Sequence, residues 1–141
     1  MLLVTGATSH TGKIFLKRLH NESYSRKIRC IVRKNSKVDW LKELNLKIEL
    51  FQGDLNNIES IAESFNNVDT VFNIAGIHFS LPLIQLGIRK NVEWFICVHT
   101  TGIYSKFKSA SNEYKNIENS ISKFSDLITI IRPTMIYGGI E

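Results

Sequence analysis

The chain has 141 residues, of which 43% are hydrophobic and 22% charged, and its formal net charge is +5. This composition is typical of one globular domain and excludes a disordered or low-complexity chain. The lysines and arginines are scattered except in the segment 26–37, which does not amount to the extended basic surface of a nucleic-acid-binding protein. We therefore expect no nucleic-acid partner.

Cys30 and Cys97 lie within apolar runs that predict buried strands. Thiols so placed favour a reduced, cytoplasmic protein over a disulfide framework. The N-terminus lacks the pattern of an export signal, and polar residues interrupt the apolar region 71–88, so we expect no membrane span. His78 and His99 stand without a spaced set of further ligands, which predicts no metal site.

Apolar runs bounded by turn residues alternate with longer segments of helical spacing. The predicted strands are Met1–Thr5, Ile28–Val32, Ile48–Gln52, Thr70–Ile74, Phe95–His99 and Leu127–Arg132. The first predicted helix follows Gly12. The later ones cover Val38–Leu44, Asn57–Ser64, Phe79–Arg89 and Ser109–Lys123. Continuous apolar strands joined by helices, with burial on both faces, predict an α/β fold. We expect a doubly wound parallel sheet, Rossmann-like, of about six strands in the order 3-2-1-4-5-6.

Residues 5–12, Thr-Gly-Ala-Thr-Ser-His-Thr-Gly, join the first strand to the first helix. Gly6 permits the positive φ of a sharp turn, and Gly12 lets the helix pack close to the strand. Ser9 stands where a second glycine is expected. Its Cβ limits how closely a phosphate approaches, while its hydroxyl can donate a hydrogen bond. The alternative is a tight turn without a ligand. We expect a pyrophosphate site formed by Gly6, Thr8, Ser9, His10, Thr11 and Gly12.

The end of the second strand indicates which dinucleotide binds. An acidic residue there would hold a free ribose 2′-OH, but the sequence has Arg33 and Lys34. A guanidinium binds a 2′-phosphate and stacks on adenine. The sequence thus favours NADP(H) over NAD(H), with a solvated basic loop as the alternative interpretation.

Small and polar residues follow the third and fourth strands. After the third, Asp54 could accept a hydrogen bond from an adenine amino group while the Leu55 backbone meets a ring nitrogen. Equally, Asp54 could cap the next helix. After the fourth, Ala75 and Gly76 leave room for a cofactor where bulk would block it. A plain turn is the alternative there.

Together these segments resemble the extended and atypical short-chain dehydrogenase/reductases, especially the NmrA-like NAD(P)-binding proteins and the NAD(P)-dependent epimerase/dehydratases. The resemblance covers almost the whole chain and rests on residues 5–8 with Gly12, and on segments 32–33, 53–55, 99–104 and 132–138. It implies a Rossmann-type NADP site. In active members it also implies hydride transfer to or from a small carbonyl, alcohol or sugar-nucleotide substrate, assisted by a Ser or Thr, a Tyr and a Lys.

The resemblance also implies catalytic residues. In active relatives a tyrosine hydroxyl transfers a proton, a lysine lowers the pKa of that tyrosine, and Ser or Thr orients the substrate. Tyr104 and Lys108 have the required spacing and would share one face of a helix, with Thr100 or Thr101 as the hydroxyl group. Tyr104 follows the threonines more closely than in typical members, so a structural tyrosine is the alternative.

The chain ends at Glu141, where members of the resembled group continue into the segments that form a substrate pocket. We expect a domain over residues 1–141 that is incomplete at its C-terminus, with a sheet edge that a second copy would cover in a homodimer. The leading hypothesis is the NADP(H)-binding domain of a short-chain reductase or epimerase with an unknown small-molecule substrate. The alternatives are a non-catalytic NADP(H) sensor and an inactive truncated fragment.

Overall fold

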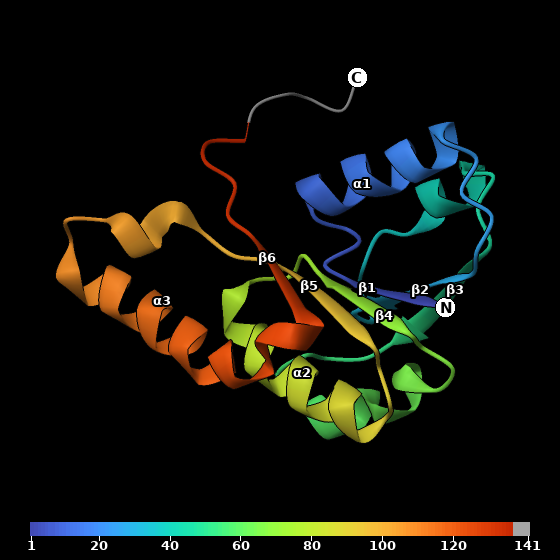
Figure 1. Ribbon diagram of the computed structural model, residues 1–141. Coiled ribbons are helices and arrows are strands. Elements are labelled where there is room, and N and C mark those ends of the chain that lie inside the picture. The colour runs from blue at the N-terminus through green and yellow to red at the C-terminus, as the bar shows by residue number, and fades with distance from the viewer. Residues whose placement is uncertain (137–141) are drawn as a thin grey trace.

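The computed structural model describes residues 1–136. Its strands are β1 Leu2–Thr5, β2 Ile28–Val32, β3 Ile48–Gln52, β4 Thr70–Asn73, β5 Trp94–Val98 and β6 Ile128–Ile131. They form one parallel sheet in the order β3-β2-β1-β4-β5-β6 (Figure 1). The predicted fold class and strand order are confirmed, and each strand begins and ends within one residue of its prediction.

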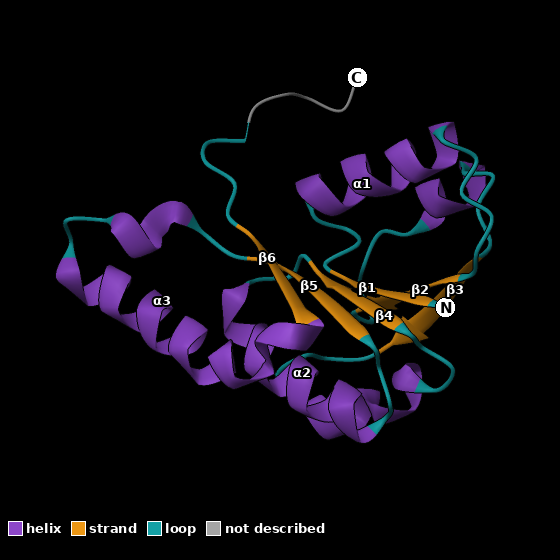
Figure 2. Cartoon of the chain, in the orientation of Figure 1, coloured by secondary structure: helices purple, strands orange, loops and turns teal. Residues whose placement is uncertain are grey.

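Helical segments connect successive strands (Figure 2). The α-helices are α1 His10–Asn21, α2 Ser80–Arg89 and α3 Lys108–Ile121. The 3-10 segments are η1 Asp39–Glu43, η2 Ile58–Phe65, η3 Ile77–Phe79, η4 Thr101–Tyr104 and η5 Ser122–Leu127. The two helices predicted at 38–44 and 57–64 are therefore present in the tighter 3-10 form. In η2, the Ser64 hydroxyl donates to the carbonyl of Ile61 at 2.6 Å, a local bond that competes with regular α-helical pairing.

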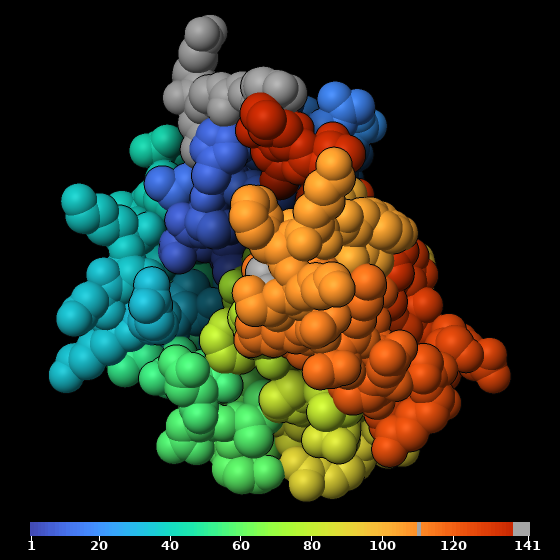
Figure 3. All heavy atoms as spheres, turned by 90° about the vertical axis from the view of Figure 1, so that its left-hand side faces the viewer, coloured from blue at the N-terminus to red at the C-terminus, as the bar shows by residue number. Residues whose placement is uncertain are grey.

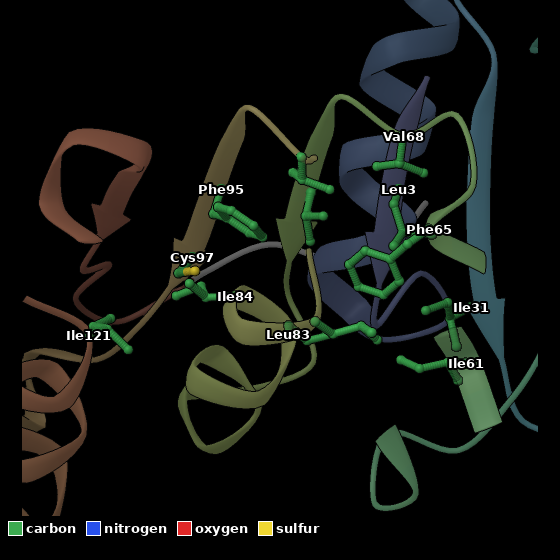
Figure 4. Close-up of a cluster of buried hydrophobic side chains, with 13 residues drawn as sticks. Leu3, Ile31, Ile61, Phe65, Val68, Leu83, Ile84, Phe95, Cys97 and Ile121 are labelled. Atoms are coloured by element: carbon green, nitrogen blue, oxygen red, sulfur yellow. The ribbon is translucent and has the colours of Figure 1, made fainter. Parts of the chain in front are cut away.

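Two hydrophobic clusters lie on opposite faces of the sheet. Leu3 points into the cluster with Phe65 and Phe95, on the face covered by η2 and α2 (Figure 4). Its neighbours Leu2 and Val4 belong to the other cluster, which α1 and η1 cover. Successive residues of a strand point to opposite faces, so a short apolar run such as that of β1 supplies both cores.

The interior and edge strands differ in burial. Strands β1 and β2 are buried along their whole length, as their continuous apolar runs predict. The residues of β3 and β6 are intermediate or exposed. The expectation of burial on both faces is wrong for these two strands, because each has a neighbouring strand on one side only within the described sheet.

The loops after β1, β2, β3 and β4 all lie at the carboxyl edge of the sheet, because the strands are parallel. Figure 3 looks onto this edge, where the segments after β1 in blue, β2 in cyan and β3 in green gather on one face. β1 pairs with both β2 and β4. The chain therefore turns from one half of the sheet to the other at β1 and β4, the switch point where ligands of such folds bind.

Candidate cofactor site

The loop after β1 is in close contact with α1 and with the loop after β4. Gly6 has a φ of +71°, and a Cβ there would lie 2.7 Å from the Ala75 nitrogen. A Cβ on Gly12 would lie 2.2 Å from the Gly6 carbonyl oxygen. Gly6 is therefore required by its conformation, and both glycines are required by the lack of space. The predicted sharp turn and close helix approach are confirmed.

Ser9 caps the N-terminus of α1. Its φ is −70°, an ordinary value, so the absence of glycine causes no backbone strain. Its Oγ accepts a hydrogen bond from the Gly12 backbone N–H at 3.1 Å. That bond does not use the hydroxyl proton, and Ser9 is exposed, so the hydroxyl can donate to an anion. Ser9 thus combines helix capping with a donor at the positive end of the helix dipole.

A cavity of about 350 Å³ opens beside this loop. Its walls come from the loops after the first four strands of the chain, as the sheet order predicts. The predicted residues that line it are Gly6, Thr8, Ser9, Arg33, Asp54, Leu55 and Ala75. Five predicted residues do not line it. His10, Thr11 and Gly12 form the first turn of α1, Gly76 follows Ala75, and Lys34 lines only a second, neighbouring cavity.

Sequence reasoning missed two polar side chains and one aromatic side chain of this cavity, namely Ser36, Asn56 and Phe79. Ser36 shapes the loop after β2, because its Oγ accepts from the Arg33 backbone N–H at 3.1 Å and its own N–H donates to the Arg33 carbonyl at 3.0 Å. The turn-forming pair at 35–36 was the available signal for this role. No comparable signal distinguishes Phe79 from the other apolar residues around it.

A second, basic cavity of about 730 Å³ adjoins the first. It shares with the first cavity Thr8, Arg33, Ser36, Gly53 and Asp54. Lys34 and Lys37 also line it, so its charged groups are three cations and one carboxylate. Within residues 1–136, none of these cations forms a salt bridge. The cavity is therefore suited to an anion.

Asp54 stabilises the turn after β3. Its Oδ1 accepts from the backbone N–H and from the side-chain amide of Asn56, both at 3.0 Å. The residue before η2 is Asn57, which makes no side-chain capping bond. Asp54 therefore orders the turn that precedes the helix rather than capping the helix itself. Its contact with adenine stays a prediction, consistent with its place in the cavity wall.

The catalytic candidates follow β5 and lie on separate elements. Thr100 caps η4, because its Oγ1 accepts from the backbone N–H two residues later at 3.0 Å, and Thr101 is the first residue of η4. Tyr104 ends η4 and is 71% exposed, whereas Lys108 begins α3. The expectation that Tyr104 and Lys108 share one helix face is wrong, because the backbone between them is extended at Ser105. Their catalytic role stays a prediction.

A row of polar side chains, buried or half-buried except for its exposed last member, crosses the carboxyl edge from β1 to the end of β6. The polar row consists of Thr5, Asn73, Ser80, His99, Glu118 and Arg132. Burial lowers the pKa of His99, although its hydrogen bond to Glu118 opposes this shift. The hydrogen bond from Arg132 lowers the pKa of Glu118. Sequence reasoning missed the polar row because its members come from distant segments that meet only in the folded chain.

Within residues 1–136, no three His, Cys, Asp or Glu side chains come together in the way a metal ion requires. No helix of that stretch has both the length and the apolar character needed to cross a bilayer. Cys30 and Cys97 are buried thiols, and burial raises the pKa of Cys30 to about 12.

Comparison with solved structures finds this fold in several proteins. Triphenylmethane reductase from Citrobacter sp., solved with NADP(H), matches with a TM-score of 0.75 and 20% identity, over 94% of this chain and 49% of its own. An NADPH-dependent quinone oxidoreductase from Escherichia coli matches with a TM-score of 0.73 and 16% identity, over 94% of this chain and 47% of its own. A short-chain dehydrogenase/reductase from Veillonella parvula matches with a TM-score of 0.76 and 15% identity, over 98% of this chain and 70% of its own. The chain thus spans about half the length of the first two.

A search of curated proteins finds no match to the sequence. A family profile described as NAD(P)H-binding matches residues 6–138. The match begins at Gly6, includes every residue of the two cavities and extends to Tyr137 and Gly138, which lie outside the described residues. Because it spans most of the chain and agrees with the observed fold, the chain belongs to the NAD(P)H-binding family and is an NAD(P)-binding Rossmann domain.

Proposed function

We propose that this domain binds NADP(H) in preference to NAD(H) and serves a reductase that acts on a small carbonyl or alcohol. The observation that supports this most directly is the place of Arg33. It follows β2 and lines both the cavity beside the glycine loop and the basic cavity. In this proposal the glycine loop holds the pyrophosphate, and Arg33 holds the 2′-phosphate.

The charges around Arg33 support the phosphorylated cofactor. A phosphate monoester carries about −1.5 to −2 charges at neutral pH, and the basic cavity offers Lys34 and Lys37 beside Arg33. Asp54, the one carboxylate in the lining of the two described cavities, is already hydrogen-bonded to Asn56. A cofactor without the 2′-phosphate leaves these cations without a counter-charge.

Titration of NADPH and NADH tests the preference. We expect Arg33→Ala to weaken NADPH binding by about ten- to a hundredfold, because it removes a charge-assisted contact, and NADH binding by less than about twofold. Arg89→Ala is the matched control, because Arg89 is exposed and pairs with Glu59 away from both cavities. Equal affinities of the unaltered protein for the two cofactors would contradict the role of Arg33.

The reductase proposal requires a proton donor, and Tyr104 is the candidate. Its hydroxyl would donate a proton to the carbonyl oxygen of the substrate, while the carbonyl carbon receives a hydride from the nicotinamide. Turnover of NADPH in a screen of small carbonyl compounds tests this step. We expect oxidation of NADPH that Tyr104→Phe and Lys108→Ala both abolish without changing the Kd for NADPH.

A second candidate function is a non-catalytic module that senses NADP(H). The separation of Tyr104 and Lys108 onto different elements favours it. NADPH binding at micromolar concentration without oxidation by any carbonyl compound would support the sensor over the enzyme. Oxidation lost in both variants would support the enzyme.

A further inference from the structure

We infer that the polar row holds one wall of the cofactor cavity in place, and that it does so only while His99 is neutral. Asn73, Ser80 and His99 are thus positioning residues for cofactor binding, although none of them lines the cavity. The inference rests on the binding of a nicotinamide dinucleotide, which follows from family membership. It does not depend on the preference for NADP(H) proposed above.

The wall in question is the peptide between Ala75 and Gly76, where Ala75 lines the first cavity. Thr5 Oγ1 accepts a hydrogen bond from the Ala75 N–H at 3.4 Å. The Asn73 side-chain amide donates to the Gly76 carbonyl at 2.9 Å. Gly76 has a φ of +142°, which only glycine adopts readily. Buried side chains of β1 and β4 therefore hold this wall from both of its ends.

Asn73 connects the wall to the rest of the polar row. Its Oδ1 accepts from Thr5 Oγ1 at 2.7 Å, and its Nδ2 donates both to the Gly76 carbonyl and to Ser80 Oγ, the latter at 3.2 Å. The reversed amide would place Oδ1 against the Gly76 carbonyl oxygen, so that two acceptors would face each other. The hydrogen bonds therefore fix the orientation of the Asn73 amide.

The carboxylate of Glu118 fixes the tautomer of His99. The pKa of Glu118 is lowered, so this group is ionised and can only accept, and His99 Nδ1 therefore carries the ring proton and donates to Glu118 Oε1 at 3.0 Å. Nε2 of the neutral ring is then an acceptor, and Ser80 Oγ donates its proton to it at 2.9 Å. Glu118 also accepts from Arg132 Nε at 2.9 Å and from its terminal nitrogen at 2.6 Å. Each polar hydrogen of the row between Thr5 and Glu118 has an acceptor when His99 is neutral.

A second proton on His99 disrupts this arrangement. The Nε2–H then points at Ser80 Oγ, so the Ser80 proton loses the ring as its acceptor and is left with the weak acceptor sulfur of Cys97. A buried donor with so poor a partner is unfavourable by about as much as an ordinary hydrogen bond contributes. The bond between Ser80 and Asn73 therefore weakens, and the Asn73 amide that holds Gly76 is no longer fixed.

Charged and titratable groups reach His99 from three elements. Glu118 faces His99 from α3, and Arg132 lies beyond Glu118 at the end of β6, with Tyr104 near Arg132. From α2, the group that contacts His99 is the uncharged hydroxyl of Ser80. On the same strand, burial raises the pKa of Cys97 to about 11, so this thiol stays neutral. Burial lowers the pKa of His99 below its ordinary value of 6.5 despite Glu118. His99 is therefore neutral at neutral pH and gains its second ring proton only as the pH falls to its lowered pKa.

The hydrogen bonds of Ser80, His99 and Glu118 have the connectivity of a hydrolytic triad. Ser80 is fully buried, however, and its oxygen already accepts a bond from Asn73. A nucleophile must be reachable by its substrate. The row therefore serves to position the wall and does not perform nucleophilic attack.

The test is the Kd for NADPH as a function of pH from 8 to 5, with circular dichroism at each pH to establish that the protein stays folded. If only the neutral form binds, the Kd rises by up to about tenfold per pH unit below the pKa of His99. His99→Gln keeps an acceptor toward Ser80 and cannot be protonated, so we expect its profile to lack this rise. The 2′-phosphate and all other groups are the same in both proteins, so the difference between the two profiles isolates His99.

Two further variants make the result decisive. Ser80→Ala breaks the row at a neutral group, and we expect it to raise the Kd for NADPH about five- to tenfold at pH 7.5. Protonation of His99 at lower pH should then cause no further rise in the Kd. His78→Gln removes a half-exposed histidine outside the row and should keep the original profile. Parallel profiles for the unaltered protein and His99→Gln would overturn the inference, as would an unchanged Kd in Ser80→Ala.

Discussion

The backbone of Gly12 packs directly against the carbonyl oxygen of Gly6, from which a Cβ at position 12 would be only 2.2 Å away. We expect Gly12→Ala to lower the free energy of unfolding by about 1–3 kcal/mol, because the helix must move away from the loop. We also expect it to weaken NADPH binding by more than about tenfold, because the same movement displaces the N–H groups of the loop. Urea denaturation and cofactor titration measure the two effects.

Gly87→Ala is the matched control for this prediction. A Cβ on Gly87 would lie 2.5 Å from the Phe95 ring, in the core away from the cofactor cavities. We expect a similar loss of stability from overpacking but no change in the Kd for NADPH. A normal Kd in Gly12→Ala would show that the close approach of helix and loop is not needed for binding.

Ser9 has two functions that substitutions can separate. Ser9→Ala removes the capping oxygen that accepts from Gly12 and should lower the free energy of unfolding by about 1 kcal/mol, whereas Ser9→Gly should lower it by only a few tenths. Both variants lack the hydroxyl donor, so we expect both to bind NADPH about three- to tenfold more weakly. Tighter binding by Ser9→Gly would mean that the serine Cβ hinders the phosphate.

Arg29 is the charged residue of β2 whose removal we expect to destabilise the fold. It is 8% exposed and donates to the carbonyls of Ser64 and Asn66 at 2.6 and 2.9 Å, and to both carboxylate oxygens of Glu49. We expect Arg29→Met to lower the free energy of unfolding by about 2–3 kcal/mol, because the two carbonyls lose their donor. Urea denaturation provides the measurement.

Arg18→Met is the control for Arg29. Arg18 forms a salt bridge with Glu22 in which both side chains are more than half exposed. Such pairs contribute little, so we expect a change within about 0.5 kcal/mol. Equal losses in the two variants would show that burial of Arg29 does not matter.

Asp69 should make the stability depend on pH in acid. Burial tends to raise its pKa, but hydrogen bonds from the N-terminal ammonium, Thr70 and Arg26 lower the pKa overall from 3.8 to about 2. The unfolded chain therefore binds more protons between these values, so the stabilisation is complete above pH 4 and is lost as the pH falls to 2. We expect a loss of about 1–2 kcal/mol in this window, reduced by solvent screening.

Denaturation at several pH values between 5 and 2 measures this loss. Asp69→Asn should have a flatter stability profile than the unaltered protein in that window. Asp39→Asn serves as the control, because the pair of Asp39 with Lys42 is exposed on both sides. If Asp69→Asn and the unaltered protein lose stability in parallel, Asp69 is not the group responsible.

The sequence predicted the sheet well because local pattern and topology determine it. Short apolar runs define each strand, and right-handed crossovers leave few possible orders. The glycine loop was equally predictable, since only glycine meets the φ of +71° at Gly6 and the lack of space at Gly12. The cavity residues in the loops after β1 to β4 could also be predicted, because the carboxyl ends of parallel strands lie at the same edge of the sheet.

The remainder of the site depends on contacts that no local pattern reveals. The spacing of Tyr104 and Lys108 suggested one helix, but the extended backbone at Ser105 separates them. The bond between His99 and Glu118 joins β5 to α3, and nothing near either residue in the sequence indicates its partner. Buried polar pairs of this kind become visible only when the neighbouring elements are placed in space.

The contact between Gly6 and the loop after β4 has a consequence for folding. The Thr5 and Ala75 groups that close this side of the cavity lie 70 residues apart in the chain. A fragment that holds only β1, α1 and β2 therefore lacks one wall, however well its helix forms. Since contacts of such separation form late, the ability to bind a nicotinamide dinucleotide should arise only after β4 has paired with β1. Binding would then report on completion of the central sheet, and the cofactor would stabilise the chain against global unfolding rather than against local fraying.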